Sequence, residues 1–298
     1  MGITVRPLHP HFAAEIVGVR LRDIDEPTFG AVREAFEEYS VLVFHDQHLT
    51  DDEQIAFTRR FGPLEETVRS IAQNTQVAPQ IADLSNVDPE GNTMAADDRR
   101  MLYHKGNQLW HSDSSFKRVP AMASLLSARE VPPEGGETEY ASLRAAWDAL
   151  PVTLQQRLED LVALHSFAYS RSLIAPDLLL PEQEAQLPPV KQRLVRANPV
   201  NGRKAVYLGS HASQILGMPV EEGRALLRDL LEHATRPEFV FVHRWRVGDC
   251  VMWDNRAVLH RGRDWDTRRY RRVMHRTTVA GDGPTVPDPV VADAAAAR

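Results

Sequence analysis

The longest apolar stretches of this sequence, Val41–Phe44 and Phe239–Val242, have the length of a single β-strand. A helix that crosses a membrane needs about 20 consecutive apolar residues, so no segment of this chain fits that role. Apolar residues in such short runs are buried by packing strands and amphipathic helices against each other. The sequence therefore predicts a globular protein whose core is carried by many short strands.

The composition excludes several classes of protein. With 298 residues, of which 43% are hydrophobic and 26% charged, the chain resembles an ordinary globular protein of one or two domains. Its formal net charge of −6 gives no sign of nucleic-acid binding. Cys250 is the only cysteine, which excludes an intrachain disulfide and a cysteine-based metal cluster. Because the first residues also lack the apolar run of a signal peptide, we expect a cytoplasmic protein.

Short strands alternate with a few helices, without the regular βαβ order of a doubly wound sheet. A capping box at Thr50 and Glu53 predicts a helix that runs through Arg60. The other helices are predicted at 27–39, 143–150, 153–164 and 220–234. Strands are predicted at 41–44, 205–208, 238–245, 250–253, 257–260 and 271–279, with a hairpin turn at 247–249.

This order of elements predicts a mainly β (α+β) protein, a β-sandwich or jelly roll with helices packed outside. We expect one domain over residues 1–280. Residues 64–106 are polar and poorly periodic, so they are predicted to form a long excursion over one face; loops of that length are usually functional or disordered. Residues 281–298, rich in Ala, Pro and Asp, are predicted to form a flexible tail.

The first chemical signal is His111-Ser112-Asp113. In a strand, residues two apart face the same way, so His111 and Asp113 could present an imidazole and a carboxylate to one ion. Two histidines and one carboxylate form the site of non-haem Fe(II) oxygenases. A His-x-Asp pair alone carries little weight, because it arises often by chance.

A second histidine is available at His260, at the end of a predicted strand. The returning strand places Arg272, Met274, Arg276 and Thr278 on one face, so two guanidinium groups project into the same interior. Buried arginines are costly unless they meet anions, and their planar fork suits carboxylates. A pair of arginines beside a His/Asp/His site could bind a dicarboxylate co-substrate and an anionic substrate.

Four separated motifs follow one another along the chain. They are Asn107-Gln-Leu-Trp-His111-Ser-Asp113-Ser-Ser-Phe116, Pro133-Glu-Gly-Gly-Glu-Thr138-Glu, Val251-Met-Trp-Asp-Asn-Arg-Ala-Val-Leu-His260-Arg-Gly and Arg271-Arg272-Val-Met-His-Arg276. Together they resemble a known family, the taurine/2,4-dichlorophenoxyacetate dioxygenases. The likeness runs from about Leu8 to Gly281, and it looks closest to the branch that acts on 2,4-dichlorophenoxyacetate.

The resemblance implies a double-stranded β-helix (a cupin-like jelly roll) and a 2-oxoglutarate-dependent non-haem iron dioxygenase. By this resemblance His111, Asp113 and His260 bind Fe(II). Thr138 and Arg272 would hold the far carboxylate of 2-oxoglutarate, the co-substrate used together with O₂. Asn107 and Arg276 would lie on the substrate side, with Arg276 pairing with an acid group.

The turn before Arg272 looks one residue longer than in related sequences, so Arg271 is the alternative 2-oxoglutarate residue. We choose Arg272, because a one-residue slip would turn the side chain out of the barrel.

The resemblance implies a small anionic substrate, with an aryloxyacetate such as 2,4-dichlorophenoxyacetate as the first choice and taurine or an alkylsulfonate as the second. It also implies a homo-oligomer. A zinc hydrolase is the alternative from another class of enzyme, since it can use His/Asp/His and a bound water, but it has no need for the Thr138 and Arg272 pair. A metal-free jelly-roll binding module would tolerate the loss of His111.

Overall fold

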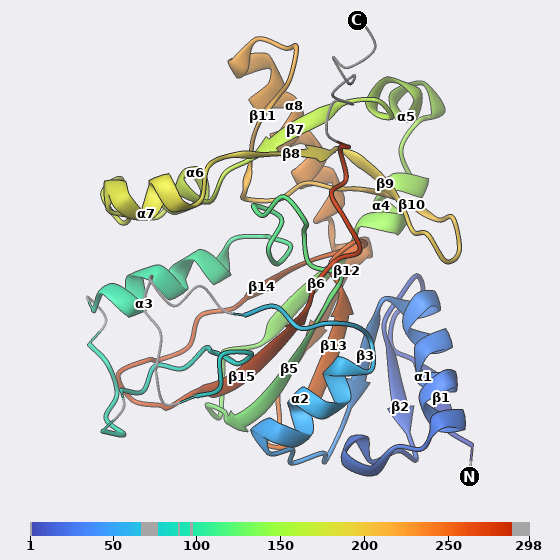
Figure 1. Ribbon diagram of the computed structural model, residues 1–298, viewed down its shortest axis with the longest axis vertical. Helices are drawn as coiled ribbons and strands as arrows, with labels where there is room; N and C mark the ends of the chain where they lie inside the picture. The colour runs from blue at the N-terminus through green and yellow to red at the C-terminus, as the bar shows by residue number, and fades with distance from the viewer. Residues whose placement is uncertain (1, 67–76, 89, 96–97, 288–298) are drawn as a thin grey trace, which may run out of the picture.

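The computed structural model of the protein describes residues 2–66, 77–88, 90–95 and 98–287 (Figure 1). The helices of this part are α1 Glu26–Tyr39, α2 Asp51–Arg59, α3 Arg99–His104, α4 Leu143–Asp148, α5 Val152–Leu158, α6 Phe167–Ser172, α7 Pro181–Gln186 and α8 Val220–Ala234, with 3₁₀ turns η1 Leu21–Asp23, η3 Lys105–Gln108 and η4 Pro237–Phe239. The strands are β1 Thr4–Pro7, β2 Ala14–Val17, β3 Val41–Phe44, β4 Ala82–Asp83, β5 Ala123–Glu130, β6 Thr138–Ser142, β7 Val162–His165, β8 Val190–Arg193, β9 Val195–Ala197, β10 Lys204–Val206, β11 Ala212–Ile215, β12 Val240–His243, β13 Cys250–Asp254, β14 Val258–Gly262 and β15 Val273–Val279.

Two sheets face each other around the centre of the molecule. The larger sheet has the strand order β1-β2-β3-β13-β5-β15-β4, and the smaller one has the order β12-β6-β14. Alternate residues of the large sheet point toward the small sheet and form one apolar core with Tyr140 and Val258. The members contributed by the large sheet are Val41, Val43, Leu126, Ala128, Val251, Trp253 and Met274. This arrangement confirms the predicted sheet-rich jelly roll with helical decoration.

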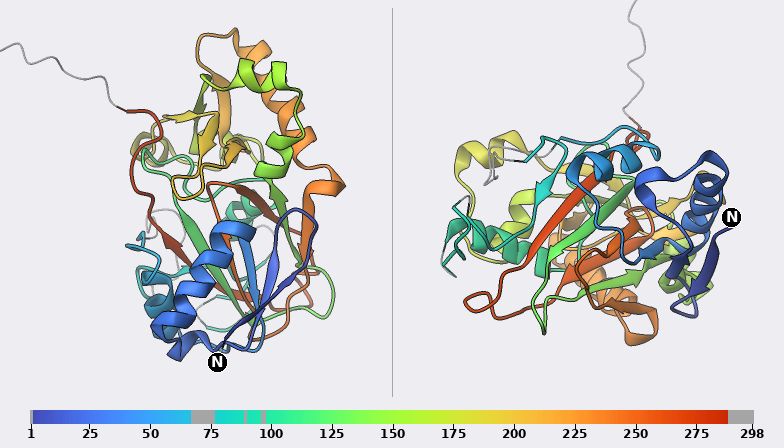
Figure 2. Two further views of the ribbon diagram at one scale, coloured as in Figure 1. Left: turned by 90° about the vertical axis from the view of Figure 1, so that its right-hand side faces the viewer. Right: turned by 90° about the horizontal axis from the view of Figure 1, so that it is seen from below.

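Helices α1 and α2 cover the outer face of the large sheet (Figures 1 and 2). The outward residues of the strands, such as Leu42 and Met252, pack there against Phe36 of α1 and Phe57 of α2. The predicted capping box begins α2: Thr50 Oγ1 accepts from the Glu53 amide at 3.2 Å, and Glu53 Oε2 accepts from the Thr50 amide at 2.8 Å.

Residues 143–239 form a helix-rich region at the upper end of Figure 1. It has its own apolar core between α4, α8 and the short strands β9 and β10. Helix α8 covers 220–234 as predicted. The predicted helix at 153–164 is wrong in its second half, because α5 ends at Leu158 and Val162–His165 is strand β7, which pairs with β8 and β11.

Two further predictions need correction. Residues 247–249 do not close a hairpin, because β12 belongs to the small sheet and β13 to the large one, so this turn crosses between the sheets. The last strand begins at Val273 instead of Arg271, so Arg272 precedes β15. The alternation of apolar and polar residues indicates that a segment is a strand, but it does not indicate which sheet the strand joins.

The predicted excursion at 64–106 is less irregular than expected. It contributes β4, which pairs with β15 at the edge of the large sheet, and α3, which leads into η3 beside the site. Residues 67–76, 89 and 96–97 lie outside the described part, as does 288–298 of the predicted tail. Within the described residues, no helix is both long and apolar enough to cross a membrane.

The capping box at the start of α2 gives a first prediction. Thr50→Ala should lower the free energy of unfolding by about 1 kcal/mol, because the amide of Glu53 loses its acceptor. Thr50→Ser keeps the hydroxyl and should retain most of the stability. Urea denaturation followed by circular dichroism measures both variants; an unchanged midpoint for Thr50→Ala would show that the cap contributes nothing.

Candidate active site

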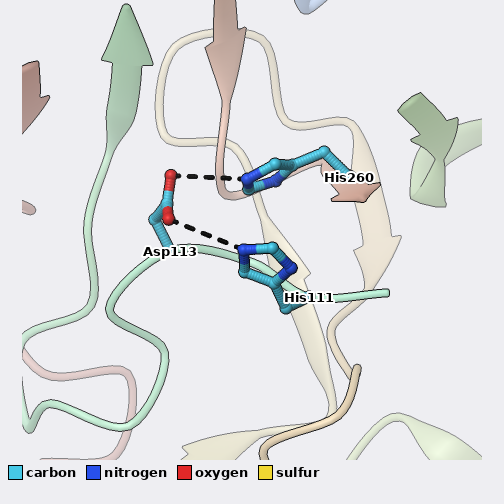
Figure 3. A group of neighbouring side chains, drawn as sticks. All are labelled: His111, Asp113 and His260. Atoms are coloured by element: carbon cyan, nitrogen blue, oxygen red, sulfur yellow. Dashed lines mark ion pairs between the residues drawn. The ribbon is translucent and has the colours of Figure 1, made fainter. Parts of the chain in front are cut away.

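Three buried side chains meet between the two sheets, as Figure 3 shows. The Nε2 atom of His111 lies 3.9 Å from Asp113 Oδ1, and the Nε2 atom of His260 lies 3.7 Å from Asp113 Oδ2. One ligand atom from each of the three residues lies within 4.8 Å of the others. These spacings suit a single metal ion bound by two imidazoles and one carboxylate.

A backbone bridge brings the two histidines together. The His111 amide donates to the His260 carbonyl at 3.1 Å, and the His260 amide donates to the His111 carbonyl at 2.9 Å. The segment after η3 thereby pairs with β14 of the small sheet. His111 Nδ1 lies 2.8 Å from the Leu109 carbonyl, a bond that places the proton on Nδ1 and leaves the Nε2 lone pair for a metal.

Asp113 lies in a turn after this bridge and not in a strand, so the strand alternation used in the sequence analysis is the wrong reason for its position. Asn255, in the turn after β13, accepts from the Asp113 amide at 3.1 Å and from Trp253 Nε1 at 3.0 Å. The Asn255 amide group donates to Ser124 Oγ at 2.9 Å, and Ser124 donates to Asp113 Oδ2 at 2.7 Å. The large sheet thus holds the carboxylate through Asn255 and Ser124.

The charges around the three residues favour the metal-binding protonation states. Burial by itself would raise the pKa of Asp113, but Arg276, the two histidines and the Ser124 hydroxyl outweigh it and lower that pKa to about 2. Burial lowers the pKa of His111, and burial and His111 together hold the pKa of His260 well below its usual value. At neutral pH the set is one carboxylate and two neutral imidazoles.

Arg276 projects from β15 toward the same carboxylate, and its Nη1 donates to Asp113 Oδ1. Its Nε atom is buried and has no hydrogen-bond partner among the described residues. The predicted substrate-side arginine therefore lies directly beside the three candidate metal ligands. The Nη1 group of Arg276 therefore pairs with Asp113, while its Nε group remains available to a ligand.

A cavity of about 270 Å³ opens next to the three residues. Thr138 of β6 and Arg272 line it together with Trp253, Trp265 and Leu126. Arg272 is buried and forms no ion pair with a described residue, and burial lowers its pKa to about 10. Such a cation suits a buried anion.

Backbone contacts hold Arg272 in this position although it lies before the strand. Its amide donates to Asn86 Oδ1 at 2.8 Å, and its Nε donates to the Gly136 carbonyl at 3.2 Å. A Cβ on Gly136 would lie 3.1 Å from that Nε atom, so glycine is what permits the close approach. Arg271 points to the surface and pairs with Glu130.

Asn107 lies in η3 and lines the first cavity and an adjoining one of about 150 Å³. The second cavity also contains His111, Asp113 and Arg276. The structure therefore places all seven predicted residues around one site. Sequence reasoning missed several residues of the second cavity or left their roles open, because they come from separate segments without a shared spacing: Tyr103, His104, Phe116, Phe167, Arg171 and His211.

Comparison with known proteins places this chain in a family. Residues 4–278 match the taurine catabolism dioxygenase TauD, TfdA family. The alpha-ketoglutarate-dependent 2,4-dichlorophenoxyacetate dioxygenase of Cupriavidus pinatubonensis is 46% identical, over 94% of this chain and 98% of that protein. The (S)-phenoxypropionate/alpha-ketoglutarate-dioxygenase of Sphingobium herbicidovorans is 39% identical, over 93% and 95%.

A solved structure agrees with these sequence matches. The structure of AAD-2 in complex with Mn(II) and N-oxalylglycine superimposes with a TM-score of 0.88 at 47% identity, covering 96% of this chain and 100% of that one. The chain belongs to the TauD/TfdA family of dioxygenases. The predicted class, a 2-oxoglutarate-dependent dioxygenase, is thereby confirmed.

The hydroxyl of Ser124 should matter for metal binding because it orients the Asp113 carboxylate. We expect Ser124→Ala to weaken binding of Mn(II) or Fe(II) by about 10-fold or more. Ser127 is a matched control, since it is buried on the same strand but bonds to Gln54 at 2.6 Å, away from the site. Calorimetric metal titration of both variants tests this; equal affinities would contradict the role of Ser124.

Proposed function

We propose that this chain is an Fe(II)- and 2-oxoglutarate-dependent dioxygenase that hydroxylates the ether carbon of an aryloxyacetate. The observation that carries the proposal is a buried His/Asp/His set next to a cavity in which Arg272 is the only buried arginine of the described lining that forms no ion pair. A zinc hydrolase would not require that buried cation. The 46% and 39% identical relatives, whose names specify dichlorophenoxyacetate and phenoxypropionate, support the substrate class.

In this proposal Arg272 and Thr138 bind the far carboxylate of 2-oxoglutarate. Thr138 accepts a hydrogen bond from Trp245 Nε1 at 2.9 Å, which leaves its own hydroxyl proton free to be donated. The guanidinium of Arg272 lies over the Trp265 ring, 5.2 Å from its centroid, so its plane is fixed before the co-substrate arrives. These residues orient the keto acid end of 2-oxoglutarate toward His111, Asp113 and His260.

His111, Asp113 and His260 would hold Fe(II), which when bound would supply an oxidation in which O₂ and 2-oxoglutarate yield succinate, CO₂ and a hydroxylated substrate. The protein orients the reactants and excludes water from the site. Arg276 and Asn107 lie on the substrate side in this proposal, with the free part of Arg276 directed to the acid group. Hydroxylation of the ether methylene gives a hemiacetal, which collapses to a phenol and glyoxylate.

The same proposal includes a cytoplasmic location, which the single cysteine suits, and a homo-oligomeric state, which follows from the family resemblance. Size-exclusion chromatography with light scattering measures the oligomeric state directly. The alternative substrates are taurine and alkylsulfonates, which present a sulfonate where the aryloxyacetate presents a carboxylate.

A substrate panel tests the proposed function. We expect O₂ uptake with Fe(II) and 2-oxoglutarate to rise at least 10-fold with an aryloxyacetate, with equal amounts of phenol and succinate formed. Aryloxypropionates, alkylsulfonates and taurine complete the panel. A stronger response to taurine would replace the aryloxyacetate with a sulfonate, and hydrolysis without O₂ uptake would overturn the proposal.

The choice of Arg272 over Arg271 gives a matched pair of variants. Arg272→Ala should raise the KM for 2-oxoglutarate roughly 100-fold, because a buried charge-assisted pair is lost. Arg271→Ala should leave that KM unchanged, since Arg271 lies at the surface, where it pairs with Glu130 and donates to the Gly91 carbonyl. The opposite result would show that Arg271 binds the co-substrate.

A further inference from the structure

A second buried guanidinium faces the substrate side of the site. Arg171 of α6 is 7% exposed and lines the same 150 Å³ cavity as His111, Asp113 and Arg276. It forms no ion pair with a described residue, and its buried Nε has no hydrogen-bond partner. Its Nη1 makes a long bond of 3.4 Å to Ser170 Oγ, and its guanidinium also interacts with the hydroxyl of Tyr103.

Arg171 differs from the other cations of this cavity in its pairing. Arg276 pairs with Asp113, and Lys117 pairs with Glu65 at 2.6 Å. The described lining also contains the carboxylates of Glu66 and Asp83, but Arg171 forms no ion pair with any carboxylate of that lining. A buried charge without a partner costs several kcal/mol, so such a group is retained where a ligand supplies the opposite charge.

The surroundings of Arg171 fix its position. Its guanidinium carbon lies 4.7 Å from the centroid of the Tyr103 ring and 4.4 Å from that of Phe167. On another side it packs against η3, where a Cβ on Gly106 would lie 2.3 Å from its Nη1. Cation–π contacts of this kind contribute modestly and use the face of the guanidinium, whereas a carboxylate is bound by its N–H groups.

A row of aromatic rings connects Arg171 with the candidate metal ligands. The Phe167 ring lies 6.0 Å from His211 and 4.5 Å from Phe116, and His211 lies 6.4 Å from His111. These rings offer an apolar wall for an aryl group. A cation and an aromatic wall in one cavity match the two ends of an aryloxyalkanoate.

We propose that Arg171 is a specificity-determining residue whose guanidinium binds the acid group of the substrate. This inference rests on the proposed function and adds a second cation to the substrate side. Because Arg276 shares its charge between Asp113 and the acid group, Arg171 supplies the further charge that gives the cavity its preference for an acid over a neutral molecule. Gly106 positions Arg171 by leaving room for its Nη1.

The test compares 4-chlorophenoxyacetate with its neutral amide. Under anaerobic conditions, with Fe(II) and 2-oxoglutarate bound, Arg171→Met should weaken binding of the acid about 10- to 100-fold and leave binding of the amide within about 2-fold. Arg171→Lys, which keeps the charge but not the fork, should fall between wild type and Arg171→Met. Calorimetry gives these affinities without turnover, and kcat/KM for the acid should fall in parallel.

Two further variants separate recognition from folding. Arg224→Met is the matched control, because Arg224 also lies over a tyrosine ring, 5.3 Å from the Tyr169 centroid, but outside the cavity lining. It should leave acid binding unchanged. Gly106→Ala keeps the guanidinium but displaces it, and should lower the acid preference as Arg171→Met does. Uncoupled 2-oxoglutarate turnover without substrate should be unchanged in the control Arg224→Met, and circular dichroism shows whether each of the other variants is folded.

The outcomes distinguish this inference from the proposed function. If the wild-type protein binds neither the acid nor the amide, the proposed substrate class is wrong. If the wild-type protein prefers the acid and Arg171→Met keeps that preference, Arg171 is a packing residue and the inference is overturned. An equal loss for acid and amide would also overturn it, because a change of cavity shape would explain both.

Discussion

The structure depends on keeping the carboxylate of Asp113 ionised between two sheets. A buried carboxylate is stable only when hydrogen bonds and positive charges replace its water. The large sheet supplies these through Ser124, Asn255 and Arg276, and the small sheet supplies His260. Each sheet therefore needs the other at this position, and the geometry of the site follows from how the two sheets pack.

The two cavities beside the Asp113 carboxylate also contain buried charges. Each contains a buried arginine that forms no ion pair with a described residue, Arg272 in the first and Arg171 in the second. A reaction that couples decarboxylation of a dicarboxylate co-substrate to oxidation of an acidic substrate needs two such anion sites. Arg272 precedes β15, whereas Arg171 belongs to α6. Because the two arginines lie on different elements, a change at Arg171 can alter substrate preference without affecting co-substrate binding.

Much of the site was predictable because its residues lie in contiguous motifs. The motif around His111 and Asp113 and the one ending at His260 carry the candidate metal ligands, although Asp113 is placed by a turn and not by strand alternation. The capping box at Thr50 and helix α8 were predicted from local patterns. Arg171 and Asn86 could not be found in this way, because their importance arises from burial and from contacts across the fold. The strand that begins at Val162 was missed for the same reason, since pairing with β8 and β11 overrides local helix preference.

The fate of molecular oxygen is the most direct test of the central claim that this site couples 2-oxoglutarate to oxidation of an aryloxyacetate. We predict that turnover of an aryloxyacetate under ¹⁸O₂ places one ¹⁸O atom in each succinate formed, as measured by mass spectrometry. The label should depend on Fe(II) and disappear in His111→Ala. Succinate without ¹⁸O, or a product oxygen derived only from water, would contradict the account.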